Sequence, residues 1–150
     1  MRKHYWALNE ISVDGLAESP DQRCEEIQMT DRVMFYNWDE IEGEVVRPGV
    51  TRKGFRGDDV MLVMNTLAQG MELSPHSHTF EQVVYIVQGT VNFHVDGEVY
   101  EASAGSVIRI PPHKEHFAEP TGDVPVLNLD VFAPMRQDYM HLVEYQNFED

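Results

Sequence analysis

The stretch GMELSPHSHTFEQVVYIVQG, from Gly70 to Gly89, decides how this chain is interpreted. Its histidines, His76 and His78, are two residues apart, and on an extended segment such residues point to the same face. Both imidazoles can therefore reach one ion. Gln82 follows His78 by four residues, an even number, so on an extended chain its side chain returns to that face.

A second segment, IPPHKEH at residues 110–116, ends a predicted strand with another histidine, His116. A pair of antiparallel strands can bring His116 across from the first set. Three neutral imidazoles and a neutral amide leave a divalent ion its full charge, which favours Lewis-acid polarisation over redox work. Such a site suits one divalent transition metal ion, namely Zn, Ni, Fe or Mn.

Two further histidines lie near this set in the sequence. His113 is close to His116, and we expect it to be a loop residue at the mouth of the site. His94 alternates with the apolar residues Val91, Phe93 and Val95, so it belongs on the face opposite to theirs. We interpret His94 as an ordinary surface histidine.

Short β-rich runs alternate with turn signals from Met34 onward, at intervals of about 8 to 12 residues, which is typical of an all-β sandwich or barrel. Asp96-Gly97 between two such runs predicts a two-residue hairpin. The predicted strands are Met34–Tyr36, Glu44–Arg47, Thr51–Phe55, Val60–Leu67, Glu72–Leu73 running towards His78, Gln82–Gln88, Thr90–Val95, Glu98–Glu101, Ser106–Ile110, His116–Glu119 and Val126–Phe132.

The length of 150 residues indicates one ordinary domain. We divide it into an acidic N-terminal extension at 1–33, with a short helix starting at Ser19-Pro20-Asp21, a barrel at 34–140 and a tail at 141–150. The net charge of -15 disfavours nucleic acid and anionic membrane surfaces as partners. The single cysteine, Cys24, excludes an internal disulfide, and no signal peptide or membrane span is evident, so we expect a cytoplasmic protein.

A second polar set stands near the end of the predicted barrel, in the stretch NLDVFAPMRQDY at residues 128–139. Asn128, Asp130 and Phe132 alternate with apolar residues, so two polar groups and a ring share one face of the last strand. If that face looks inward, an acid and a phenyl wall flank the metal, and Arg136 can fold over the mouth. The alternative is that Asp130 and Arg136 form a structural ion pair at a strand end.

The histidine motifs resemble those of the cupin superfamily. The first cupin motif, with its glycine, H-x-H, glutamine and second glycine, is matched throughout residues 70–89. The second motif is matched at Gly105 and His116, but Ser103 replaces a proline and His113 stands where many members have glycine. The resemblance implies an all-β cupin fold, the double-stranded β-helix or jelly-roll barrel, with a metal held by His76, His78, Gln82 and His116.

Residues 34–140 further resemble the pectin-degradation cupins of the KdgF type, on the strength of Glu81-Gln82 after the H-x-H and the terminal DVFAPMRQDY. Those enzymes convert ring-closed 4,5-unsaturated uronates to open-chain keto acids. The resemblance implies active-site roles for Asp130, Phe132 and Arg136. It therefore favours a metal-dependent ring opening or keto–enol tautomerisation of a small carboxylated, oxygen-rich substrate.

Two other functions stay open. The chain could be a non-haem iron dioxygenase or a metal-dependent lyase, or it could be a non-catalytic module that binds a metal and a sugar acid. In the strand Gln82–Gln88, the face opposite Gln82 carries Val83, Tyr85 and Val87, which must be covered if Gln82 looks inward. A second subunit or the N-terminal extension can cover this apolar row, and the habit of the relatives favours a homodimer.

Overall fold

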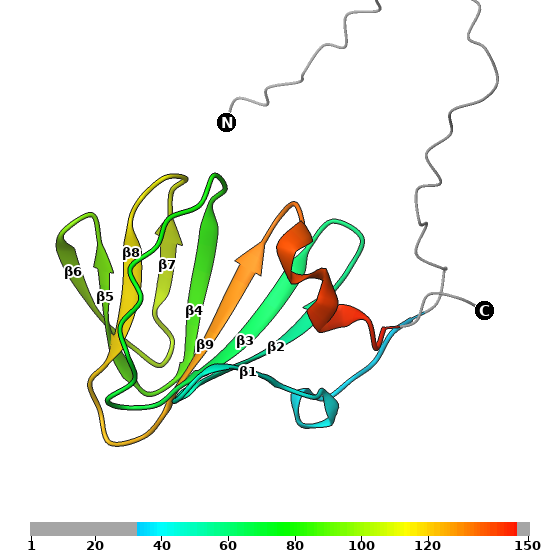
Figure 1. Ribbon diagram of the computed structural model, residues 1–150, viewed down its shortest axis with the longest axis horizontal. Helices are drawn as coiled ribbons and strands as arrows, with labels where there is room; N and C mark the ends of the chain where they lie inside the picture. The colour runs from blue at the N-terminus through cyan, green and yellow to red at the C-terminus, as the bar shows by residue number, and fades with distance from the viewer. Residues whose placement is uncertain (1–32, 147–150) are drawn as a thin grey trace, which may run out of the picture.

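Two β-sheets that face each other make up residues 33–146, the part of the chain that the computed structural model describes (Figure 1). The larger sheet has the order β1-β2-β3-β9-β4-β7 and the smaller has the order β6-β5-β8. The fold is therefore mostly β with two sheets, as the spacing of the β-rich runs predicts. The predicted helix after Ser19 and nearly all of the acidic extension lie outside the described residues.

The elements follow one another with short connections, and within the described residues both helices are short 3-10 helices. No helix there is long or apolar enough to cross a membrane. In chain order the elements are η1 (Trp38–Glu40), β1 (Glu44–Arg47), β2 (Val50–Arg56), β3 (Met61–Leu67), β4 (Gln82–Gln88), β5 (Thr90–Val95), β6 (Glu98–Ser103), β7 (Val107–Ile110), β8 (His116–Pro120), β9 (Val126–Phe132) and η2 (Gln137–Val143).

The inward faces of β3 and β9 carry a polar layer between two apolar clusters. On β9, Val126 belongs to one cluster and Phe132 to the other, while Asn128 and Asp130 lie between them on the same face. On β3, Asn65 pairs directly with Asn128 across the strands. Apolar packing on both sides therefore holds these amide and carboxyl groups in fixed places.

The hairpin between β5 and β6 has the turn that the sequence predicts. Val95 pairs with Glu98, and the two residues between them, Asp96 and Gly97, have φ angles of 50° and 84°. A type I′ turn requires positive φ at both central positions, and an Asp-Gly pair accepts these angles readily. The hairpin prediction is confirmed.

Two predicted strands are absent from the described residues. Met34–Tyr36 forms no strand, and Phe35 is 89% exposed. Glu72–Leu73 is also irregular, and only a single antiparallel bridge between His76 and His116 follows it.

The last described residues pack on the larger sheet, and η2 crosses the boundary we place at residue 140 (Figure 1). Leu142 and Val143 are buried in the cluster of Phe132. A Cβ at Gly54 of β2 would lie 2.7 Å from the Leu142 Cβ, so the absence of a side chain there lets η2 approach the strand. This approach places the first turn of η2 beside the polar layer.

Candidate functional site

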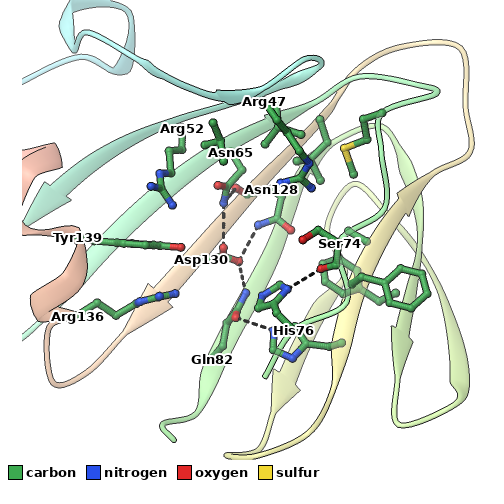
Figure 2. A pocket seen from close by; sticks show the side chains of 18 residues that line it. Arg47, Arg52, Asn65, Ser74, His76, Gln82, Asn128, Asp130, Arg136 and Tyr139 are labelled. Carbon is green, nitrogen blue, oxygen red and sulfur yellow. Dashed lines mark hydrogen bonds between the residues drawn. The ribbon is translucent and has the colours of Figure 1, made fainter. Parts of the chain in front are cut away.

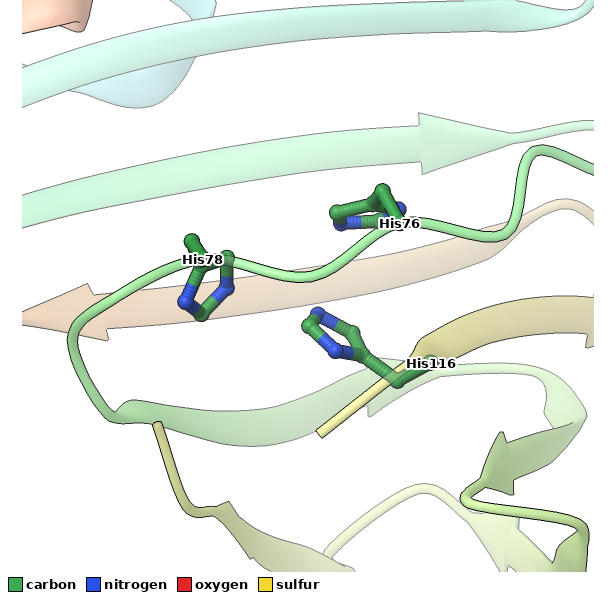
Figure 3. Close-up of side chains that lie close together, drawn as sticks. All are labelled: His76, His78 and His116. Carbon is green, nitrogen blue, oxygen red and sulfur yellow. The ribbon is translucent and has the colours of Figure 1, made fainter. Parts of the chain in front are cut away.

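Three histidines converge on one point between the sheets (Figure 3). His76, His78 and His116 each offer a ring nitrogen, and these nitrogens lie within 4.8 Å of one another. The backbone fixes two of them, because the His76 N–H donates to the His116 carbonyl at 3.1 Å and the His116 N–H donates back at 2.8 Å. The cluster can hold one metal ion.

Backbone carbonyl groups set the tautomer of all three rings. Each Nδ1 lies within hydrogen-bond distance of a carbonyl oxygen, which can only accept, so Nδ1 carries the proton and Nε2 keeps its lone pair. In each case the carbonyl belongs to a residue two positions away: Ser74 for His76 at 2.9 Å, Phe80 for His78 at 2.6 Å and Lys114 for His116 at 2.8 Å.

Gln82, the first residue of β4, adds a fourth lone pair to this group. Its Oε1 lies 3.0 Å from His78 Nε2 and 3.2 Å from His116 Nε2, while its amide nitrogen donates to Asp130 Oδ1 at 2.7 Å. With Nδ1 protonated, these Nε2 atoms and Oε1 are all acceptors and have no proton to share. Acceptors that converge in this way create a place that favours a cation.

Burial keeps His116 neutral and ready to bind. The residue is 2% exposed, and burial together with the neighbouring His76 and His78 lowers the pKa of its imidazole to about 4. A backbone hydrogen bond from His116 to the Lys114 carbonyl opposes this shift only in part. At neutral pH the ring therefore offers its Nε2 without first losing a proton.

Three amides hold Asp130 beside the histidines (Figure 2). Gln82 and Asn128 both donate to Asp130 Oδ1 at 2.7 Å, and Asn65 donates to Oδ2 at 2.9 Å. Each of these amides lies on a different strand, so the carboxyl group cannot rotate without breaking a bond to β3, β4 or β9. Asp130 is thus linked to the candidate metal ligands through Gln82.

Burial raises the pKa of Asp130 to about 6, although the three amide hydrogen bonds and Arg136 favour the ionised form and hold the pKa down. The desolvation of the carboxylate outweighs these contacts. A carboxyl group with this pKa can both accept and donate a proton near neutral pH. Asp130 is therefore suited to acid–base chemistry.

We expect Asp130→Asn to change how the stability of the metal-free protein depends on pH. The unfolded chain loses this proton near pH 3.8 and the folded chain near pH 6, so wild-type unfolding free energy falls as pH rises through this window. The variant avoids this loss, and its stability relative to wild type rises by about 2 kcal/mol between pH 4 and 7. Urea unfolding with a chelator present measures the difference, and a pH-independent difference would contradict the raised pKa.

The structure places Arg136 and Phe132 near the site, but their contacts differ from those that the sequence predicts. Arg136 pairs with Asp138, through Nε at 3.1 Å and Nη2 at 2.5 Å, and makes no hydrogen bond with Asp130 among the described residues. The structural ion pair between Asp130 and Arg136 that the sequence left open is thus not formed. Phe132 is 1% exposed and contacts the rings of His78 and Phe80 edge-on, so it supports the site from behind and does not face the pocket.

The pocket beside the histidines is also lined by residues that sequence reasoning missed (Figure 2). They are Asn65 on β3, Arg47 and Arg52 from β1 and β2, and Tyr139 in η2. Asn65 interrupts the inward apolar row of β3, and Arg52 does the same on β2 between Val50 and Gly54. A polar residue at an inward position was the available signal for both, but nothing local indicates Tyr139.

The remaining candidate histidines lie apart from the cluster. His94 lies 2.8 Å from Glu119 and stacks on the Phe117 ring, consistent with an ordinary structural role. His113 is exposed with a φ of 66°, and its N–H donates to the His78 carbonyl at 2.7 Å. His113 therefore supports the loop of His78 through its backbone, and its ring is not part of the group.

A family model described as "Cupin domain" matches residues 63–132. Residues 63–132 form a cupin domain. The match includes all three histidines, Gln82 and Asp130, and it ends before Arg136 and η2. The cupin domain thus supplies the histidine end of the pocket, and the segments that flank it supply the arginines and Tyr139.

Several known proteins are similar to this chain. A cupin described as RmlC-like from Shewanella frigidimarina has a TM-score of 0.64 and 28% identity, over 72% of this chain and 96% of its own. KdgF from a Halomonas species has a TM-score of 0.64 and 29% identity, over 71% and 98%. An uncharacterized protein of Methanocaldococcus jannaschii is 29% identical over 86 residues, which are 57% of this chain and 69% of that protein. These matches support the cupin fold and the resemblance to KdgF.

Proposed function

We propose that this protein is a metal-dependent cupin enzyme that opens the ring of a small carboxylated, oxygen-rich molecule, or tautomerises it, as in the linearisation of an unsaturated uronate. The observation that carries the proposal is the shared amide of Gln82, which faces the histidines with its oxygen and Asp130 with its nitrogen. One side chain thus places a cation site and an acid–base group next to each other.

The roles in the candidate centre follow from the donor atoms. His76, His78 and His116 would hold one divalent transition metal ion through Nε2, and Gln82 would offer Oε1 as a fourth ligand. A bound ion would supply Lewis-acid polarisation of a hydroxyl or carbonyl oxygen. Zn, Ni, Fe and Mn all suit such a set, because imidazole accepts each of them.

Asp130 moves the proton in this proposal. When a cyclic hemiacetal with an enol ether opens, a proton leaves the hydroxyl, the ring carbon–oxygen bond breaks and the enol carbon gains a proton. Substrate and product are isomers, so one carboxyl group that accepts and then returns a proton is sufficient. Arg136 binds the carboxylate of the substrate. Phe132 packs against the His78 ring on the side away from the pocket and holds that ring in place.

The comparisons support this proposal at the level of the family. KdgF from Halomonas shares the fold at 29% identity, and the KdgF-type cupins that the sequence resembles act on unsaturated uronates. The sequence MFYNWDEI at residues 34–41 and the terminal DVFAPMRQDY carry the same resemblance. The acidic character of such a substrate fits a pocket lined by three arginines.

The test is to mix the protein with a 4,5-unsaturated galacturonate and follow the loss of the ultraviolet absorbance of its double bond, with product identification by NMR. We expect product to form faster than in buffer alone, at the same rate with and without oxygen. An oxygen requirement would favour the dioxygenase, and a cleaved product would favour the lyase. Saturable binding without any product would favour the non-catalytic module. Each of these outcomes rejects the proposal.

The homodimer is part of this proposal. The outer face of the larger sheet exposes Tyr85 and Val107, which are paired across β4 and β7 and are 41% and 67% exposed. Val87, further along β4, is 39% exposed. Two copies related by a two-fold axis can bury this face against each other, because an isologous contact uses the same patch twice.

A further inference from the structure

We propose that Arg52, together with Tyr139, forms the second half of a carboxylate-binding wall, so that two guanidinium groups and a phenol hydroxyl recognise the acid group of the ligand, in place of Arg136 alone. The inference rests on the proposed function in one respect, that the pocket takes a small carboxylated molecule. It assigns Arg52 as a residue that determines the specificity for a charged ligand.

The first observation is a stack of three side chains. The Cζ atom of Arg52 lies 4.2 Å from the centroid of the Tyr139 ring, and the Cζ atom of Arg136 lies 3.6 Å from the same centroid. Figure 2 shows the two arginines on opposite sides of this ring. Guanidinium groups are attracted to the faces of aromatic rings, so one tyrosine fixes the positions of both cations.

The second observation is that acids tether both arginines and leave donors free. Arg52 Nε donates to Glu44 at 2.6 Å, and the Nε and Nη2 of Arg136 donate to Asp138. Within residues 33–146, no hydrogen bond or ion pair uses Nη1 or Nη2 of Arg52. The Tyr139 hydroxyl likewise makes no hydrogen bond with these residues. The tethers therefore orient the guanidinium groups, and the unused N–H groups remain for a ligand.

The third observation is that these donors are largely removed from water. The side chains of Arg52 and Arg136 are 16% and 12% exposed, and both line the pocket beside the histidines. Donors that face a pocket can bind a planar carboxylate, because its two oxygens match the fork of a guanidinium. An anion at this wall would satisfy donors on both sides of Tyr139.

The charge of the surroundings favours a second arginine at this wall, because Glu44 and Asp138 already balance part of the charge of Arg52 and Arg136. The whole chain has a net charge of -15, and Asp130, the one acid that lines this pocket, would repel a carboxylate ligand. A second guanidinium offsets that repulsion. In Figure 2, Asp130 lies between the arginine wall and His76. A ligand that spans the pocket thus has its acid group at the wall and its other oxygens at the histidines.

The test compares the binding of D-galacturonate and neutral D-galactose by calorimetry, using the full chain. We expect wild type to bind galacturonate more tightly than galactose. We expect Arg52→Gln to weaken the binding of galacturonate by about 10- to 100-fold and to leave the binding of galactose unchanged. The matched control is Arg109→Gln, because Arg109 is also tied to a glutamate through Nε but is 63% exposed and lies outside this pocket. This control should bind both sugars as wild type does.

A second variant guards against loss of structure in the first. Tyr139→Phe keeps the ring between the arginines and removes only the hydroxyl, and we expect it to weaken galacturonate several-fold. Unchanged galacturonate binding in Arg52→Gln, or no binding by wild type, overturns the inference. If galacturonate binding depends on Arg52 but the protein does not convert the unsaturated uronate, the proposed function is rejected and the carboxylate-binding wall is supported. If the protein converts the uronate but binding does not depend on Arg52, only the wall is rejected.

Discussion

Asp130→Asn is expected to lower the turnover of the unsaturated uronate by about 10²- to 10⁴-fold, the range typical of a lost general acid–base group, while the metal content stays at the wild-type level. The amide that replaces the carboxyl group has nearly the same shape but cannot exchange a proton. Stopped-flow or steady-state absorbance measures turnover, and elemental analysis measures the metal on the same sample.

The hydrogen-bond network tolerates this exchange. The new amide oxygen can take the place of Oδ1 and accept from Gln82 and Asn128, while the new amide nitrogen faces Asn65. The Asn65 side chain can turn its amide so that its oxygen accepts from that nitrogen, and it then loses only two long contacts, of 3.4 Å each, with the Val63 and Asn128 carbonyls. Gln82 thus keeps its orientation towards the histidines. A loss of activity with the metal retained is then a loss of chemistry.

Asp123→Asn is the matched control, since Asp123 is exposed and lies outside the pocket. This variant makes the same chemical change and should convert the substrate at the wild-type rate. Wild-type turnover in Asp130→Asn would show that another group moves the proton. Loss of both metal and turnover would show that Asp130 acts by holding Gln82, and the acid–base role would then be wrong.

His76→Ala is expected to weaken metal binding by more than about 100-fold, beyond the 10- to 100-fold that changes in the outer contacts of a metal site usually cause. His76 is exposed, whereas His116 is 2% exposed, so this substitution removes a nitrogen ligand without opening a cavity in the core. The metal content of protein purified without a metal-affinity tag, followed by competition with a chelator, gives the result.

Two histidines near the cluster serve as controls for this experiment. His94→Ala removes a ring that lies with Glu119 and Phe117, and His113→Ala removes an exposed ring close in sequence to His116. Both variants should retain the metal. A wild-type metal affinity in His76→Ala would contradict the three-histidine centre, as would metal loss in the control variants alone.

The sequence could predict that the histidines lie together because most of its signals at this end of the pocket are local. His76, His78 and Gln82 are close in the chain, and the alternation on β9 places Asn128 and Asp130 on one inward face, as the structure shows. Regular alternation fails where the chain is irregular. Glu72–Leu73 is not a strand, and the segment that follows pairs only through the single bridge between His76 and His116.

The arginine wall could not be predicted, because its parts meet only in the folded chain. Arg52 on β2 and Tyr139 in η2 come together where Gly54 lets η2 approach the strand. The choice of Asp138 over Asp130 as the partner of Arg136 depends on that same packing. Alternation along a strand gives the face of a residue, and it contains no information about which distant segment covers that face.

The amide of Gln82 has one more consequence. Its oxygen faces the imidazoles, and its nitrogen donates a hydrogen bond to Asp130. A cation bound beside the oxygen polarises the amide, so that its N–H becomes a stronger donor to the carboxyl group of Asp130. Occupancy of the cation site would then make Asp130 a stronger acid. The acidity of Asp130 would thereby depend on whether a cation occupies the histidine site.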